Sequence, residues 1–192
     1  MTIVLATQNP GKIAEIRALL PEGWQVATAT ELGVTEDIPE TGETLEENAL
    51  QKAQYLFDRS GKPALADDTG LEIEALNGAP GVYSARYAGE EKDNEKNMAK
   101  VLKELSDTSN RKARFRTVLA WVTPEGSKYF EGIVHGEIAE THLRGEHGFG
   151  YDPIFVPKGE HRSFAQMSAE EKSAMSHRGR ALRAFVAHLT SP

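Results

Sequence analysis

The chain has 192 residues, of which 39% are hydrophobic and 27% charged, a formal net charge of −7 and no cysteine. The length fits a single domain over residues 1–192 with room for two lobes, and the missing cysteines exclude disulfides, thiolate nucleophiles and cysteine-ligated zinc. The acidic balance disfavours a nucleic-acid binder, and no apolar run approaches the roughly 18 residues of a membrane span. The N-terminal residues lack the basic region and cleavage site of a signal peptide, so we expect a cytoplasmic protein without a membrane partner.

The first third of the chain alternates between strand and helix patterns. The expected elements are a strand over Thr2–Ala6, a helix over Lys12–Leu20, a strand over Trp24–Ala29, a helix from the Thr44–Glu47 capping box to Ser60, and a strand over Ala64–Asp67. Strands that alternate with helices favour an α/β fold with some parallel pairing.

The rest of the chain predicts antiparallel pairing and further helices. The expected elements are a Gly/Pro-rich loop over Asn77–Gly89, a helix over Asp93–Leu105, a β-hairpin of Arg114–Thr123 with Tyr129–Ile138, a strand over Pro153–Val156, a capping box over Ser168–Glu171 and a helix over Ala181–Leu189. The central sheet is therefore expected to be mixed, with helices flanking it.

Two adjacent carboxylates, Asp67 and Asp68, follow the apolar segment Ala64–Ala66. We interpret this stretch as a buried strand that runs into a turn at Gly70. Successive side chains of a strand point to opposite faces, so only one aspartate can face a given pocket. We predict Asp68 as the working acid and Asp67 as its neighbour. The alternative is a solvated strand-to-turn junction.

The segment Thr7-Gln8-Asn9-Pro10-Gly11-Lys12 joins the first strand to the first helix. Free N–H groups and the positive dipole end at a helix N-terminus suit phosphate, and Lys12 adds a point charge. The segment is not a Walker A loop, because Ala6 and Ile13 stand where that motif requires glycine and serine or threonine. The alternative is an ordinary strand–helix turn.

Lys52 lies within the apolar stripe of the helix that begins near Thr44. A lysine on a buried face either extends its ammonium group to water or meets an anion. Glu40 stands shortly before this helix and could stabilise its N-terminus. Alternatively, Glu40 and Asp68 together bind magnesium, which needs few protein carboxylates when water and substrate phosphates complete its shell.

Two further segments carry candidate binding residues. Gly148-Phe149-Gly150-Tyr151-Asp152 interleaves small and aromatic residues, which could expose a ring for stacking on a base; core packing of Phe149 is the alternative. Near the C-terminus, Lys172 could neutralise phosphate, and His177 with Arg178 could donate hydrogen bonds to a ligand carbonyl. The alternative there is a helix that ends and restarts, with Ser176 as a cap.

In this order, these segments resemble the inosine triphosphate pyrophosphatase family of non-canonical purine nucleoside triphosphate pyrophosphatases. The matching stretches are Leu5–Lys12, Glu40–Gly42, Glu47–Ala49, Lys52–Ala53, Ala66–Leu71, Gly78–Tyr87, Gly148–Pro153, Lys172–Ser173 and Ser176–Gly179. The region from about Arg111 to Leu143 matches in pattern only.

The resemblance implies an elongated, two-lobed fold with a long mixed sheet and a nucleotide cleft between the lobes. It also implies a homodimer, a magnesium requirement, and hydrolysis of ITP, dITP and XTP to the monophosphate and pyrophosphate. By that match, Asp68 accepts a proton from the attacking water, and Glu40 and Asp68 hold the metal. The residues matched to phosphate contacts are Thr7, Gln8, Asn9, Pro10, Gly11, Lys12, Lys52 and Lys172. Those matched to nucleoside contacts are Thr69, Phe149, Gly150, Tyr151, Asp152, His177 and Arg178.

Two other functions stay open on the residues alone. One is a hydrolase of similar chemistry that prefers pyrimidine or modified-base triphosphates. The other is a nucleotide-binding module without catalysis, in which the carboxylates only stabilise turns.

Overall fold

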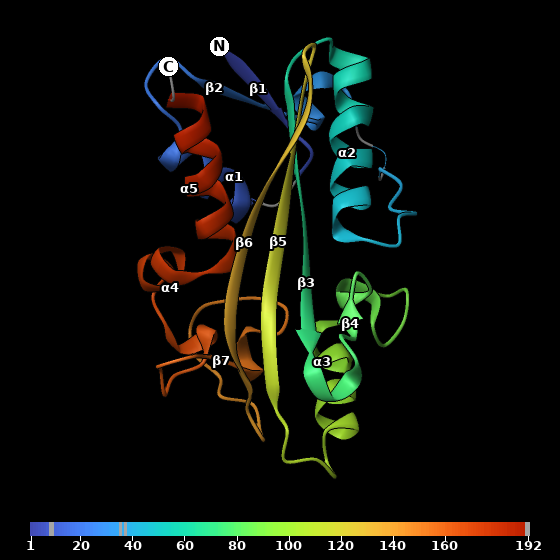
Figure 1. Ribbon diagram of the computed structural model, residues 1–192, viewed down its shortest axis with the longest axis vertical. Coiled ribbons are helices and arrows are strands. Elements are labelled where there is room, and N and C mark those ends of the chain that lie inside the picture. The colour runs from blue at the N-terminus through green and yellow to red at the C-terminus, as the bar shows by residue number, and fades with distance from the viewer. Residues whose placement is uncertain (8–9, 35, 37, 191–192) are drawn as a thin grey trace. The chain divides into compact units, whose positions relative to one another are not determined.

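The computed structural model describes residues 1–7, 10–34, 36 and 38–190 (Figure 1). Its described strands form one mixed sheet in the order β2-β1-β3-β5-β6-β7, with β4 paired to β3. The strands are β1 (Thr2–Leu5), β2 (Gln25–Thr28), β3 (Ala64–Ile73), β4 (Pro80–Gly81), β5 (Lys112–Thr123), β6 (Gly126–Ile138) and β7 (Phe155–Pro157). Pairing is parallel between β1 and both β2 and β3, and antiparallel for β3–β4 and β6–β7. The predicted α/β class with a mixed sheet is therefore confirmed.

The described helices are α1 (Pro10–Leu19), α2 (Leu45–Ser60), α3 (Asn94–Glu104), α4 (Ala169–Met175) and α5 (His177–Thr190). Short 3₁₀ turns cover Thr30–Leu32, Glu74–Leu76, Ser84–Arg86, Asp152–Ile154 and Phe164–Gln166. Among the described residues, no helix is both long and apolar enough to cross a membrane.

The chain divides into two compact units. Unit 1 comprises residues 1–68, 117–132 and 180–192, and unit 2 comprises residues 69–116 and 133–179. Each unit has a core of its own.

Unit 1 buries both faces of its strands. Ile3 and Leu5 of β1 join a cluster with residues of α1 and α5, whereas Val4 packs with Leu56 of α2. Figure 1 accordingly shows α1 and α5 on one side of these strands and α2 on the other. The alternation follows from the two-residue period of a strand, and helices on both sides are the usual partners of parallel strands.

Unit 2 has an aromatic core. Phe115 of β5 packs on Phe155 of β7, with ring centroids 4.7 Å apart, and Phe164 lies 5.2 Å from Phe155. Met98 and Val101 of α3 belong to the same cluster. This core holds in place the segments that carry the predicted nucleoside-binding residues.

Several helix ends lie where the capping residues in the sequence predicted them. The Thr44 side chain accepts a hydrogen bond from the Glu47 N–H, and the Glu47 carboxylate accepts one from the Thr44 N–H, which completes the predicted capping box. Gly61 ends α2 in the left-handed conformation with φ of 62°. The second capping box at Ser168 and the hairpin of β5 and β6 are also confirmed.

The predicted turn after Asp67 is wrong, because β3 continues through Asp68 and Gly70 to Ile73. Gly70 serves a different purpose. A Cβ atom at Gly70 would lie 2.7 Å from the carbonyl oxygen of Gly81 in β4, so glycine permits the close approach of the two strands.

Other boundaries differ from the predictions. The helix α1 begins at Pro10 and α5 begins at His177, earlier than expected, whereas β7 begins only at Phe155, after a 3₁₀ turn. The predicted 77–89 loop contains β4 and a 3₁₀ turn.

Candidate functional site

The carboxylates Asp67 and Asp68 emerge from β3 on opposite faces. Asp67 shares its face with Leu65, which packs in the cluster of α1 and α5, and Asp68 shares its face with Ala64, which packs in the cluster of α2. Each aspartate meets a lysine from the helix on its own side. The predicted separation of the two acids is therefore confirmed.

On the α1 side, Lys12 Nζ lies 2.7 Å from Asp67 Oδ2. The side chain of Asp67 is 8% exposed and that of Lys12 is 21% exposed. The ion pair thus balances the charge of a nearly buried carboxylate. It also fixes the position of the Lys12 ammonium group, which belongs to the first turn of α1. The sequence indicated a neighbouring role for Asp67 but carried no signal that Lys12 is its partner.

On the α2 side, Lys52 lies between two carboxylates. Its Nζ atom is 2.6 Å from Glu40 Oε1 and 3.3 Å from Asp68 Oδ1. Lys52 is only 8% exposed, in a row with buried Asn48, Ala49 and Leu56. The interpretation that this lysine meets anions is confirmed, and extension of its ammonium group to bulk water is ruled out.

The segment that carries Glu40 is fastened to α2. The Gly42 N–H donates to Asn48 Oδ1 at 2.8 Å, and the Thr41 N–H donates to Gln51 Oε1 at 3.0 Å. Asn48 is 1% exposed, so this bond is protected from water. Asn48 and Gln51 are positioning residues for Glu40, and their polar side chains at helical spacing on α2 are the signal that could have revealed them.

Burial raises the pKa of the Asp68 carboxyl, and the charges of Glu40 and Asp67 add to this rise against the opposing effect of Lys52. For Lys52, burial acts to lower the pKa, but attraction by Asp68, Glu40 and Asp67 outweighs it, so the pKa is raised. Glu40 and Asp68 together carry one more negative charge than the Lys52 ammonium group that they contact. Such a cluster favours a further cation.

The residues present fit a magnesium ion. Glu40 and Asp68 both reach the same Nζ atom, so their oxygens converge on one cation. Oxygen donors are the ligands that magnesium prefers, and it usually takes one or two carboxylates with water and substrate phosphates. No cluster of three or more His, Cys, Asp or Glu side chains suited to a metal occurs in the described part of the chain.

Of the other residues predicted to bind phosphate, Thr7 lies between β1 and α1, and Pro10 and Gly11 open α1. Gln8 and Asn9 lie outside the described residues.

Unit 2 contains a second cluster around an exposed aromatic ring. Phe149 is 51% exposed, and the Lys172 Nζ and Arg178 Cζ atoms lie 4.8 Å and 5.6 Å from its ring centroid. Core packing of Phe149 is therefore wrong. Gly148 and Gly150 have φ of 94° and 63°, which side chains rarely adopt, and these two residues turn the backbone so that Phe149 points outward.

The buried carboxylate of Asp152 links the Phe149 backbone to Lys172. It is 2% exposed and accepts hydrogen bonds from the Phe149 N–H at 2.7 Å and from the Lys172 ammonium group. A Cβ atom on Gly148 would lie 2.6 Å from Asp152 Oδ2, so the loop closes tightly over the carboxylate. Asp152 is thus committed to holding Phe149 and Lys172.

The remaining predicted residues of unit 2 are mostly buried. His177 and Arg178, at the start of α5, are 4% and 5% exposed, and the His177 ring stacks on Phe115 with centroids 4.6 Å apart. The Gly179 N–H donates to Ser176 Oγ at 3.1 Å, so Ser176 caps the restarting helix as the alternative interpretation held. Tyr151 is 5% exposed within the core, and Thr69 is half-buried on β3.

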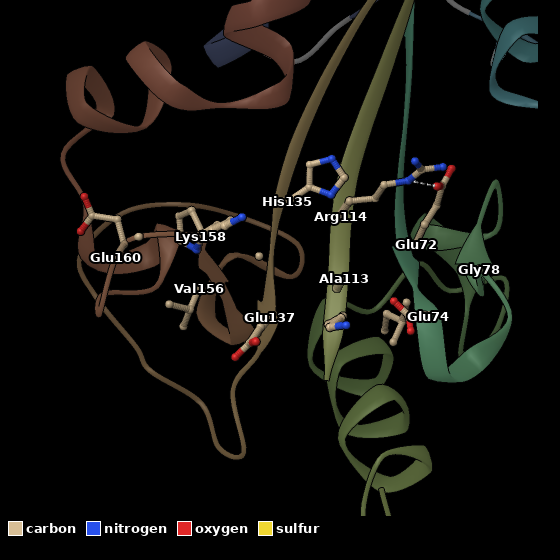
Figure 2. A pocket seen from close by; sticks show the side chains of 15 residues that line it. Glu72, Glu74, Gly78, Ala113, Arg114, His135, Glu137, Val156, Lys158 and Glu160 are labelled. Atoms are coloured by element: carbon tan, nitrogen blue, oxygen red, sulfur yellow. Dashed lines mark hydrogen bonds and ion pairs between the residues drawn. The ribbon is translucent and has the colours of Figure 1, made fainter. Parts of the chain in front are cut away.

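A cavity of about 720 Å³ in unit 2 contains none of the predicted site residues (Figure 2). Basic lining residues Lys112, Arg114 and Lys158 are offset by acidic Glu72, Glu74, Glu137 and Glu160. Arg114 is already paired to Glu72, with Nε 2.6 Å from Oε2. With this balance of charge the cavity has little attraction for a triphosphate, so we do not assign the nucleotide tail to it.

The carboxylates and lysines gathered beside β3 are suited to an enzyme that acts on phosphate groups, and comparison with known proteins identifies the family. Residues 3–188 match the Ham1 family, and the chain belongs to that family. The resemblance to inosine triphosphate pyrophosphatases inferred from the motifs is confirmed.

Curated relatives agree over nearly the whole chain. The dITP/XTP pyrophosphatase of Bacillus subtilis is 50% identical over 184 residues, covering 94% of this chain and 92% of the relative. That of Flavobacterium psychrophilum is 48% identical and covers 97% of both chains. Among solved structures, the Staphylococcus aureus Ham1 protein is 45% identical, with a TM-score of 0.91 and 98% of both chains covered. A HAM1 protein from Coxiella burnetii is 44% identical, with a TM-score of 0.93 and coverage of 99% and 98%.

Proposed function

We propose that this protein hydrolyses the non-canonical purine nucleoside triphosphates ITP, dITP and XTP to the monophosphate and pyrophosphate, removing deaminated purines from the nucleotide pool. The observation that carries the proposal is Lys52, buried between the carboxylates of Glu40 and Asp68. The names of the curated relatives support the same reaction.

In the proposed reaction a water oxygen attacks the α-phosphorus, the bond from that phosphorus to the β-phosphate bridging oxygen breaks, and pyrophosphate leaves. Asp68 accepts the proton of the water. Burial raises the pKa of Asp68, which makes its carboxylate a stronger proton acceptor than an exposed one. Lys12, Lys52 and Lys172 bind the phosphates, together with the segment from Thr7 to Gly11.

We propose that Glu40 and Asp68 hold magnesium. When bound, the ion would offset negative charge on the phosphate oxygens and so favour departure of pyrophosphate. The protein's own contribution is to hold two carboxylates in place, Asp68 on the rigid strand β3 and Glu40 through the hydrogen bonds of its segment to α2.

Base selection is assigned to residues of unit 2. The exposed ring of Phe149 offers a stacking surface, and such stacking is worth about 1–3 kcal/mol per base. His177 and Arg178 donate hydrogen bonds to the keto oxygen at C6 of hypoxanthine or xanthine, where adenine carries an amino group. A buried donor that loses its acceptor is costly, so donors of this kind discriminate strongly between the two. Thr69, Gly150, Tyr151 and Asp152 complete the set of residues assigned to the nucleoside end.

We further propose that the protein acts as a cytoplasmic homodimer on free nucleotides, with neither nucleic acid nor membrane as a partner. The net charge of −7 supports the absence of a nucleic-acid partner. Light scattering at micromolar concentration tests the dimer, and a monomeric mass would contradict it.

The function is tested with a panel of ITP, dITP, XTP, ATP, GTP and pyrimidine triphosphates, with and without magnesium and with detection of pyrophosphate. We expect kcat/KM for ITP and XTP to exceed that for ATP and GTP by at least about tenfold. Comparable values for these four would contradict the specificity, and a preference for pyrimidines would favour the related hydrolase. Tight ITP binding without magnesium-dependent turnover would favour a binding module.

A further inference from the structure

The hydroxyl group of Tyr151 is buried and committed to a partner within the protein. Its Oη atom donates a hydrogen bond to the backbone carbonyl of Ser84 at 2.7 Å, and the residue is 5% exposed in the core of unit 2. Burial raises the pKa of this phenol, so the hydroxyl keeps its proton and remains a donor at physiological pH. Because the single hydroxyl proton is donated to the Ser84 carbonyl, the side chain has no hydrogen-bond donor left for a ligand.

The partner of Tyr151 is itself firmly attached to the sheet. The Ser84 hydroxyl accepts a hydrogen bond from the Leu71 N–H of β3 at 2.9 Å and donates one to the Gly81 carbonyl at 2.6 Å. The bond from Tyr151 therefore ends on a segment that is anchored to β3, and not on a free loop.

Tyr151 lies in the same short segment as Phe149, whose ring is exposed. Phe149 lies two residues before it, between glycines with positive φ that impose little conformational restraint of their own. Asp152, the next residue, holds the Phe149 N–H and the Lys172 ammonium group. Tyr151 and Asp152 are thus two buried residues whose hydrogen bonds hold the segment that carries the exposed Phe149 ring.

We propose that Tyr151 is a positioning residue, which fixes the Phe149 ring for stacking on the purine through its hydrogen bond to the Ser84 carbonyl. The inference rests on the proposed function and changes the role of Tyr151 from nucleoside contact to support. A loop that must be ordered on binding lowers affinity, so a loop ordered beforehand strengthens nucleoside binding without altering the reacting atoms.

The test is Tyr151→Phe, which keeps the ring in the core and removes only the hydroxyl. We expect KM for ITP and the inhibition constant of IMP to rise about three- to tenfold, while kcat and inhibition by pyrophosphate change by less than about twofold. Pyrophosphate lacks a base, so its binding reports the phosphate end alone. A merely structural defect would weaken both inhibitors together.

Tyr87→Phe is the matched control. The Tyr87 hydroxyl also donates to a group in unit 2, the Glu104 carboxylate, but Tyr87 is not among the assigned binding residues. We expect wild-type constants from this variant. Ser84→Ala is a second variant, which releases the Ser84 segment from Leu71 and Gly81 without altering Tyr151 and should produce the same selective loss of IMP affinity.

Thermal unfolding of each variant identifies any that fails to fold. If Tyr151→Phe does not fold, the inhibition constants of Ser84→Ala test the proposal instead. The proposal is overturned by unchanged KM and IMP inhibition, by equal weakening of IMP and pyrophosphate, or by loss of kcat at constant KM. A wild-type protein that does not hydrolyse ITP would instead overturn the proposed function. The two failures are therefore distinct.

Discussion

Asp67 and Asp68 are consecutive residues of β3, yet each forms its ion pair with a lysine from a different helix, Lys12 of α1 and Lys52 of α2. The strand's two-residue period sends the two carboxylates to opposite faces, and a helix covers each face. The two adjacent aspartates thus form one ion pair on each side of the sheet. Lys52 also contacts Glu40, with Nζ 2.6 Å from Oε1.

Replacing the proposed proton acceptor should stop the reaction without unfolding the protein. In Asp68→Asn the amide is nearly the same size but cannot take the proton of the attacking water, so kcat for ITP should fall by at least about 100-fold. Steady-state kinetics measure the loss, and thermal unfolding checks the fold. Near-normal turnover would remove Asp68 from this role.

Lys52→Met should shift the pH dependence of the reaction in a defined direction. Burial raises the pKa of Asp68, and Lys52 opposes that rise. Without Lys52 the pKa rises further, and because Asp68 accepts a proton only when it is deprotonated, the acid limb of kcat/KM should move to higher pH. Profiles at one magnesium concentration measure the shift.

Lys62→Met is the control for that experiment, since Lys62 is exposed and lies on the turn before β3. Its acid limb should coincide with that of the wild type. A limb that stays in place, or moves to lower pH, in Lys52→Met would show that Lys52 does not set the proton affinity of Asp68.

Glu40→Gln should weaken the response to magnesium. The neutral amide is a poorer ligand than a carboxylate, so we expect the magnesium concentration for half-maximal activity to rise about tenfold. Glu43→Gln is the matched control, because Glu43 stands three residues further on in the same segment and is exposed. Identical magnesium titrations for the two variants would contradict a metal-binding role for Glu40.

Gly70→Ala tests the close approach of β3 and β4. The added Cβ atom would lie 2.7 Å from the Gly81 carbonyl oxygen, a backbone atom that cannot move aside cheaply. We expect a loss of about 1–3 kcal/mol in the free energy of unfolding, measured by urea denaturation. Wild-type stability would mean that the two strands separate without cost.

Some features could be predicted because their causes lie within a few residues. The capping box at Thr44 needs only Glu47, and the helical spacing on α2 is enough to place Lys52 on the buried face. Gly70, by contrast, predicts a turn when only its neighbours in the sequence are considered, because the contact that requires glycine there is with the distant Gly81. Similarly, spacing alone could not decide that Phe149 is exposed while Tyr151 is buried, since a 2.7 Å bond to Ser84 fixes the latter.

The amino-acid sequence by itself determined the α/β class, the ends of α2 and α3, the family resemblance and the residues able to carry phosphate chemistry, because periodicity, caps and motifs act over short distances along the chain. Only the tertiary structure decided which charges meet: that Lys12 pairs with Asp67, that Lys52 joins Glu40 to Asp68, and that Asp152 holds Lys172. These pairings bring together residues from different helices, strands and loops. Ion pairs depend on separations of a few ångströms, and such separations are set by the packing of whole elements and not by local sequence.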